Sequence, residues 1–233
     1  MTPDAVSAEE RPAAAAVDWS AGESRWPPAL TLLAFLVVNV TVRVWIPSDG
    51  VIRVPWLLPA IEVVLILVLV TNRPDSPAER VRLRQLAIVL TGLLVFGALW
   101  ATSLLLYDII EGKGQANSAR DLLATGGLVW VGNNLAFAIL YWLLDGGGPV
   151  ARAQRATPVD FAFTQHLSPE VSPAGWRPVF LDYLHLGFTN ATAFSPTDVM
   201  PLTHRAKFAM VVQATIALAL FGLVVARAVN VLQ

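Results

Sequence analysis

Five apolar runs, each close to the length that crosses a lipid bilayer, constrain the fold of this chain more than any other feature. A transmembrane helix needs about 20 predominantly apolar residues, because each residue advances about 1.5 Å through a hydrocarbon core about 30 Å thick. The runs are about Pro28–Ile46, Val51–Thr71, Gln85–Ile110, Leu122–Leu144 and Thr203–Val231. The sequence therefore predicts an all-α integral membrane protein with about five transmembrane helices, placed in the cell membrane and in contact with its lipids.

The composition favours the same class of protein. Of the 233 residues, 55% are hydrophobic and 14% are charged, and the formal net charge is −1. These values lie outside the range of soluble domains, and they provide no basic surface for a nucleic-acid partner. The chain has no cysteine, which excludes disulfides and thiol chemistry.

Four regions are predicted along the chain. Residues 1–25 are rich in Ala, Pro, Glu and Ser, and we expect a disordered N-terminal tail because such a composition buries little apolar surface. Residues 26–145 form a four-helix membrane region, and residues 146–177 form an extramembrane loop. Residues 178–233 hold a further short apolar segment and the last transmembrane helix.

The segment Phe180–Pro201 has the pattern of a re-entrant element. Its first half reads as a short helix, since Pro178 suits the first helical turn and Asp182 complements the positive N-terminal end of a helix. Its second half is rich in Thr, Ser and Asn, and Pro196 prevents a helix from continuing. Irregular backbone survives at membrane depth only where it is buried in protein or lines a water-filled cavity.

The second half of this segment resembles the potassium-channel pore sequence FTTLTTVGYGDITP. Residues 188–201 of this chain read FTNATAFSPTDVMP and match it at Phe188, Thr189, Thr192, Asp198 and Pro201. The resemblance covers only the last quarter of the chain, and it implies a pore helix, a filter-like loop and an inner helix.

A second resemblance covers about 200 residues from Trp26 onward. The chain resembles a bacterial multi-pass membrane-protein family, a domain of unknown function, whose motif is of the type DFLYFSF…VSD. The corresponding residues here are Leu181–Phe188 and Ser195–Asp198. This resemblance implies a membrane fold with a pore-like segment and a final helix, and no particular activity.

The filter-like residues differ from the potassium-channel pattern at the two glycine positions on which potassium selectivity depends. A potassium filter presents rings of backbone carbonyls, and its two glycines adopt backbone angles that other residues reach only with strain. Ser195 and Thr197 occupy those two positions, with Pro196 between them. The sequence therefore argues against a potassium-selective filter.

Taken together, the patterns indicate a weakly selective cation channel without the potassium signature. The residues expected to line the narrow part and its mouth are Thr192, Ala193, Phe194, Ser195, Pro196, Thr197 and Asp198. One loop and one helix cannot enclose a pore, so a homo-oligomer is expected, a tetramer by resemblance. The alternative is a non-conducting membrane scaffold or partner-binding protein that keeps a pore-type fold.

Polar residues inside apolar runs are costly and so mark functional or structural sites. Asn39 and Arg43 are predicted to hydrogen-bond Glu62 and so fasten the first two helices together. The alternatives are a proton or ion site at Glu62 or a neutral, protonated glutamate there. Asn133 and Asn134 suggest packing between helices or the lining of a cavity. Gln213, with Thr215 and Gly222 on the same helix, could face either a central pore or a neighbouring helix.

We predict no enzymatic activity, no metal and no cofactor. The three histidines, His166, His185 and His204, lie in different segments and lack the spacing of metal ligands. No nucleophile motif and no Gly-rich phosphate loop occurs in the sequence.

Two indications of membrane orientation conflict. Arginines cluster at Arg73, Arg80, Arg82 and Arg84, and the positive-inside rule would place this connector and the re-entrant loop in the cytoplasm. A potassium-channel-like pore would instead place the loop outside and the C-terminus inside, and we favour this arrangement.

Overall fold

The computed structural model describes residues 23–24, 26–45, 56–71, 77–111, 119–154, 157–192 and 198–232. Most of these residues are helical, which confirms the mostly helical class. The longer helices are α1 (Trp26–Trp45), α2 (Leu57–Thr71), α3 (Pro77–Glu111), α4 (Ala119–Leu144), α7 (Phe180–Thr192) and α8 (His204–Leu232). The short elements are η3 (Asp145–Gly147), α5 (Pro149–Ala153), β1 (Phe161–Phe163), α6 (Thr164–Leu167) and β2 (Val199–Pro201).

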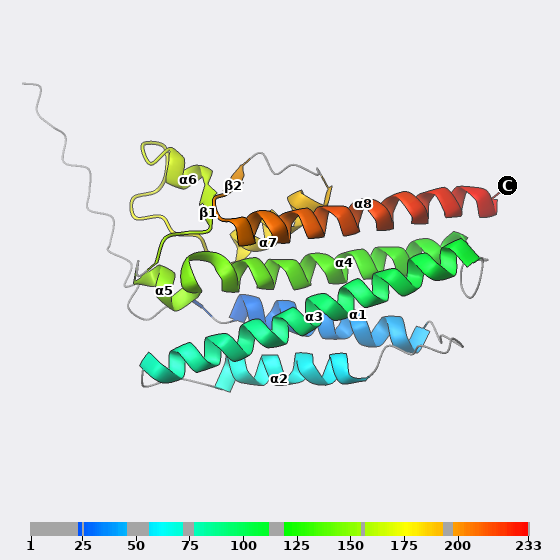
Figure 1. The fold of residues 1–233 in the computed structure, drawn as a ribbon, viewed down its shortest axis with the longest axis horizontal. Helices are drawn as coiled ribbons and strands as arrows, with labels where there is room; N and C mark the ends of the chain where they lie inside the picture. Colours follow the sequence, from blue (N-terminus) through cyan, green and yellow to red (C-terminus); the bar gives the residue numbers. More distant parts are fainter. Residues whose placement is uncertain are drawn as a thin grey trace, which may run out of the picture.

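Helix α4 is the centre of the bundle, where it contacts α1, α3, α7 and α8 (Figure 1). Residues 136–139, with sequence Ala-Phe-Ala-Ile, are all buried, and so are Tyr141 and Trp142. A helix that is apolar around its whole circumference is covered either by other elements of the protein or by lipid. Along this part of α4 the neighbouring helices provide the cover.

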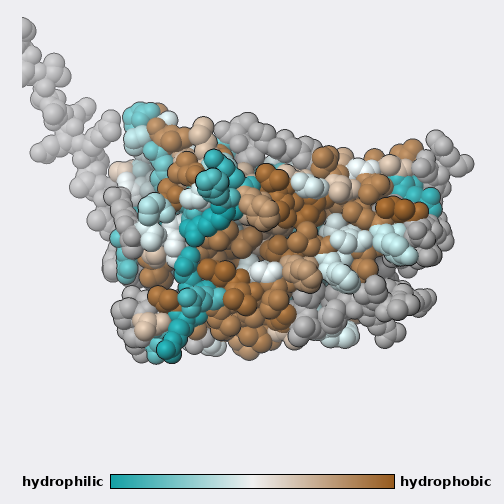
Figure 2. All heavy atoms as spheres, in the orientation of Figure 1, coloured by the Kyte–Doolittle hydropathy of each residue, from teal (hydrophilic) through white to brown (hydrophobic). Residues whose placement is uncertain are grey.

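Within the described residues, three helical stretches are long and apolar enough to cross a membrane by length and composition: Val81–Tyr107, Leu122–Gly147 and His204–Arg227. The apolar stretches of α1 and α2, Trp26–Thr41 and Pro59–Val68, are shorter. Apolar side chains cover the middle of the surface seen in Figure 2, and polar residues cross it near one end. These features are compatible with a membrane location.

At one end of the bundle, called the polar end below, a small cap lies beside the helices. Strands β1 and β2 pair in an antiparallel ladder, with Phe161 opposite Pro201 and Phe163 opposite Val199. Helices α1, α3 and α8 begin at this end, and α4 finishes there (Figure 1). The range predicted as an extramembrane loop thus contains a strand and short helices, and the ladder is an addition to the all-α class that the sequence predicted.

Helix α7 starts at the polar end and runs part of the way along the bundle, beside α4 and α8 (Figure 1). Its 13 residues span about 20 Å, so Asn190 reaches the level of Gln213, nine residues into α8. Residues Val199–Pro201 then lie back at the polar end, in the ladder with β1. The chain therefore enters and returns at the same end, and α7 ends at Thr192, before the proline at 196 that the sequence predicts a helix cannot pass.

Candidate functional site

The buried face of α7 packs against α4. The buried residues Phe180, Tyr183, Leu186, Gly187 and Asn190 recur at helical spacing and form one stripe. A Cβ at Gly187 would lie 3.2 Å from the backbone oxygen of Asn134, closer than most real contacts. Glycine at this position lets the two helix backbones approach, which fixes the depth at which α7 crosses α4.

A neutral hydrogen-bond network surrounds Gln213 and joins α4, α7 and α8. The Gln213 Oε1 atom accepts from the Tyr141 hydroxyl at 2.6 Å and from Asn190 Nδ2 at 2.8 Å. Its Nε2 atom donates to the Gly187 backbone oxygen at 2.9 Å and to Asn134 Oδ1 at 3.4 Å. Both halves of the buried amide are therefore satisfied, as burial of a polar group in an apolar region requires.

Gln213 lies on the side of α8 that faces α4 and α7. The side chain is 1% exposed and binds groups within its own bundle, so it packs between helices and does not face outward. Thr215 and Gly222 lie instead on the exposed side of α8, and the Thr215 hydroxyl donates to the Val211 backbone oxygen at 2.8 Å. Asn134 belongs to the same packing network, and its Nδ2 donates to the Trp130 oxygen at 2.9 Å.

A polar cleft of about 160 Å³ opens where α7 starts and β2 begins, and we call it the mouth cleft. It is lined by Phe163, Thr164, Gln165, Asp182, His185, Asp198 and Val199. His185 Nδ1 lies 3.4 Å from Asp198 Oδ2, which joins α7 to the residue just before β2. Burial raises the pKa of Asp182, although the Val179 amide and the nearby His185 partly offset this effect. The cleft thus gathers two carboxyl groups and an imidazole, and one of these carboxyl groups belongs to Asp198, the last of the filter-like residues.

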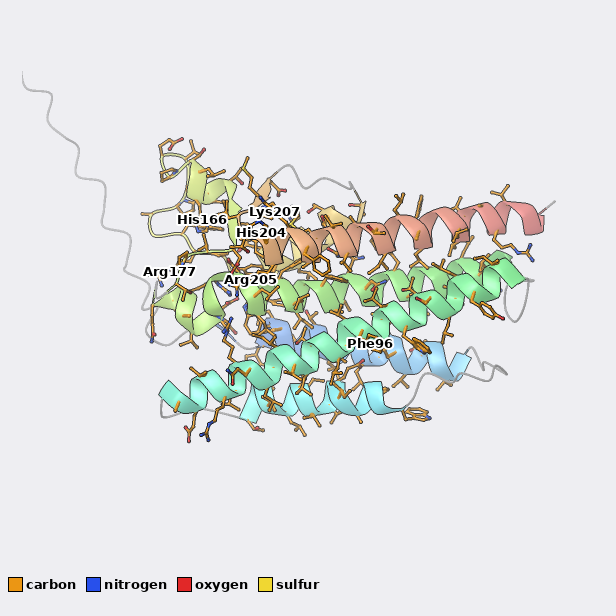
Figure 3. All side chains as sticks on the ribbon, in the orientation of Figure 1. Phe96, His166, Arg177, His204, Arg205 and Lys207 are labelled. Carbon is orange, nitrogen blue, oxygen red and sulfur yellow. The ribbon has the colours of Figure 1, made fainter. Side chains whose placement is uncertain are left out.

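The charged pair that fixes the polar end is Asp160 and Arg205. Arg205 at the start of α8 binds both carboxylate oxygens of Asp160, through Nε and Nη2, each at 2.6 Å (Figure 3). The Thr203 hydroxyl and the Gly146 backbone amide complete the set at 2.6 and 3.1 Å. Burial alone would raise the pKa of Asp160, but the hydrogen bonds from Arg205 and Thr203 outweigh it and lower the pKa.

Asp145, at the end of α4, organises the same region. Its Oδ1 atom accepts the backbone amides of Asp160 and Phe161 at 2.6 and 3.1 Å, which sets the start of β1. Its Oδ2 atom accepts the Tyr183 hydroxyl at 2.5 Å, which holds α7 to α4. Arg152 stacks over the Tyr183 ring, 4.9 Å from its centroid. One aspartate therefore links the central helix, the cap and α7.

Glu23 precedes α1 and caps α7 across 157 residues of sequence. Its Oε1 atom accepts the backbone amide of Phe180, the first residue of α7. Its Oε2 atom accepts Trp142 Nε1 at 2.8 Å and lies 3.4 Å from Arg152 Nη2. Burial raises the pKa of this carboxyl group. Glu23 falls within residues 1–25, the range predicted as a disordered tail. No pattern in the sequence indicated its contacts with α7 and α4.

The filter-like residues are only partly described. Thr192 is the exposed last residue of α7, and Asp198 is partly exposed in the mouth cleft. Ala193, Phe194, Ser195, Pro196 and Thr197 lie outside the described residues. The structure thus brings Asp198 together with His185 and Asp182, a grouping that the sequence alone did not indicate.

The predicted polar sites in the other helices form two separate contacts. Asn39 of α1 donates to Oε1 of Glu62 in α2, and Glu62 is 0% exposed. The side chain of Arg43 lies outside the described part. Asn133 of α4 donates to the Thr102 hydroxyl of α3 at 3.1 Å.

Among the described residues, no group of three or more His, Cys, Asp or Glu side chains is placed to hold a metal ion. Three acidic residues that each bind several groups, Asp145, Asp160 and Glu23, were not predicted as sites. They occur in a loop and a tail without a recognisable motif. The signal that could have found Asp145 and Asp160 is a charge placed directly beside an apolar helix or strand, because such charges are buried only when paired.

No protein-family model matches this chain, and comparisons with curated proteins and with solved structures likewise found no match.

Proposed function

We propose that this chain is a multi-pass membrane protein in which α1, α2, α3, α4 and α8 all cross the bilayer. Support comes from large apolar side chains that remain exposed on the outer faces of these helices. They include Leu30, Val37, Leu67, Phe96, Phe208 and Phe221. Phe96 projects from the middle of α3, far from the polar end (Figure 3). Lipid chains would cover this surface, which water would not favour.

In this arrangement α7 and the residues after it form a re-entrant, pore-type element. The observation that carries the proposal is the path of the chain, which reaches the level of Gln213 at Asn190 and is back in the ladder by Val199. Backbone that turns back at membrane depth needs protein or a water-filled cavity around it. The Gln213 network supplies the protein side of this enclosure.

The function proposed for this element is weakly selective passage of small cations. The C-terminal end of α7 points into the bundle, and the partial negative charge of a helix C-terminus favours cations there. Asp182 and Asp198 place carboxyl groups at the mouth. Ser195, Pro196 and Thr197 cannot present stacked carbonyl rings as a potassium filter does, so ions would pass partly hydrated.

A conducting path would require several copies of the chain. The outward side of α8 from Phe208 to Val225 is apolar and has no partner within the described chain. A homo-oligomer, a tetramer by the resemblance to potassium channels, would surround the path with one re-entrant element from each copy.

The second candidate function is a non-conducting membrane scaffold. It is favoured by the position of Gln213, which faces the inside of the bundle. The polar groups of α7 and α8 bind one another within one chain, so they are not left to line a path for ions. Phe208, Val211 and Leu218 on the outer side of α8 offer no polar lining.

The test is ion flux into liposomes that contain the purified full-length protein. We expect flux with little discrimination between sodium and potassium. Phe194→Ala should increase it by removing a hydrophobic constriction, and Asp198→Asn should lower the preference for cations over anions. Glu170→Gln is the matched control, since Glu170 is an exposed acidic residue of the cap. Strong potassium selectivity would contradict the filter reasoning, and an intact oligomer without flux in parent or Phe194→Ala would favour the scaffold.

A further inference from the structure

Arg84 lies near the start of α3 and makes no hydrogen bond or ion pair with any described residue. Its Nε atom is buried and lacks an acceptor. The charged groups that interact electrostatically with it are Arg205, Asp160 and Arg152, so two of its three charged neighbours repel it. An arginine in this situation is left with donors to offer to another partner.

The nearby carboxylate cannot serve as that partner. Each oxygen of Asp160 already accepts two hydrogen bonds, from Arg205 and Thr203 at Oδ1 and from Arg205 and Gly146 at Oδ2. A carboxylate has about four acceptor positions, so Asp160 is saturated. The Arg205 side chain is nevertheless 53% exposed, which leaves the guanidinium edge away from Asp160 accessible.

The two arginines lie at the boundary between polar and apolar surface. A polar stripe crosses the bundle there, between the starts of α3 and α8, and the apolar surface begins immediately beyond it (Figure 2). The half-buried side chains of Ile88 and Val95 follow Arg84 on the same side of α3, and exposed Phe208 follows Arg205 along α8. Gly148 lies against Arg84, where a Cβ would come within 3.1 Å of Nε, so the glycine leaves room for the guanidinium.

We propose that Arg84 and Arg205 bind the phosphodiester headgroup of an anionic phospholipid, whose acyl chains lie along the apolar surfaces of α3 and α8. Guanidinium groups match phosphate oxygens in pairs and form charge-assisted hydrogen bonds with them. A lipid supplies both the anion that Arg84 lacks and the apolar chains that suit the adjoining surface. The inference rests on the proposed membrane embedding and does not depend on ion conduction.

The test measures lipid retention by the full-length protein in neutral detergent. Dioleoyl phosphatidylglycerol is titrated in competition with dioleoyl phosphatidylcholine, and bound lipid is counted by native mass spectrometry. We expect preferential retention of phosphatidylglycerol that falls as the salt concentration rises. Arg84→Gln should weaken it roughly fivefold, the effect of one interfacial cation worth about 1 kcal/mol, whereas Arg84→Lys should retain most of it.

Two control variants lie on the same two helices. Arg82 and Lys207 are exposed, and neither is among the hydrogen-bond or ion-pair partners of Asp160 and Arg205 within the described residues, so Arg82→Gln and Lys207→Gln should bind like the parent. Equal weakening by these controls, or no weakening in Arg84→Gln, would overturn the site. Displacement of the lipid by glycerol 3-phosphate at equal concentration would show a soluble-anion site instead.

If Arg84→Gln does not fold, the parent still decides the question. Equal retention of the two lipids, or retention that is insensitive to salt, would overturn the proposal without any variant. Ion flux plays no part in this measurement, so a failed flux assay and a failed lipid assay remain distinguishable. Release of the protein from washed membranes by detergent but not by salt tests the embedding on which both proposals rest.

Discussion

The two halves of α7 are held by different chemistry. At its start, charged groups make the contacts: Glu23 caps the Phe180 amide and Asp145 accepts the Tyr183 hydroxyl. Toward its end the contacts are neutral amides, where Gln213 binds Asn190 and the Gly187 oxygen. Ionised groups lose far more solvation free energy on entering an apolar region than amides do. The change along one short helix is what a path from an aqueous boundary into a membrane would require.

The same contrast applies to the whole bundle. The polar end joins segments far apart in sequence through ion pairs, as Arg205 and Asp160 do. In the apolar middle, α3 and α4 are joined by a neutral contact between Asn133 and Thr102. Glu62 differs from this pattern, because its carboxyl group lies between α1 and α2 and accepts a hydrogen bond from Asn39. The contrast predicts that substitutions at the polar end cost the most stability.

The largest loss is expected for Asp160→Ala. This change leaves the Thr203 hydroxyl and the Gly146 amide without their acceptor, whereas water can solvate the half-exposed Arg205, so we expect a loss of about 2–3 kcal/mol. Unfolding in detergent, followed by circular dichroism, should show this loss, while Glu170→Ala at the exposed surface should unfold like the parent. A stability equal to the parent would contradict the central role of Asp160.

Lowering the pH should destabilise the parent protein in the way that Asp160→Ala does, because protonation removes the charge of Asp160. Because the pKa of Asp160 is lowered in the fold, its contribution is fully present above the unfolded-state pKa of about 3.9 and is lost as the pH falls through the lower folded-state pKa. The stability of Asp160→Ala should depend less on pH in this acidic window. An identical pH profile for parent and variant would exclude this titration as the cause of acid sensitivity.

A smaller loss is expected for Gln213→Leu. The change strands Asn190 and the Gly187 oxygen in an apolar setting, and interhelical hydrogen bonds in membranes are worth about 0.6 kcal/mol each, so the total should be about 1–2 kcal/mol. Thr215→Val on the exposed side of α8 is the control. Protease sensitivity of the 180–201 segment should rise in Gln213→Leu alone if this network secures α7.

The smallest change is expected at Glu62. Glu62→Leu removes the acceptor of Asn39 and should cost about 1 kcal/mol, whereas Glu62→Gln keeps a hydrogen bond and should cost less. Equal stability of Glu62→Leu and the parent would mean that the pair does not fasten α1 to α2. Loss of a pH-dependent activity in both variants, with expression intact, would instead indicate a proton site.

Much of the fold could be predicted because the length of an apolar stretch, and the polar residues within it, can be read directly from the sequence. The apolar length of the stretches in α3, α4 and α8 indicated helices suited to a bilayer, and Asn39 with Glu62 stood out as polar groups within apolar runs. The filter-like resemblance and the oligomer stay predictions, since residues 193–197 lie outside the described part.

The sequence by itself determined which segments are helical and apolar, because backbone hydrogen bonds within a helix and side-chain hydrophobicity depend on nearby residues. Only the tertiary structure decided which polar groups meet. Glu23 caps a helix 157 residues away, and Gln213 turns toward α7 when its position in the sequence allowed either direction. Such contacts depend on how the helices are rotated and how deeply they cross, and these are set by close packing at positions such as Gly187.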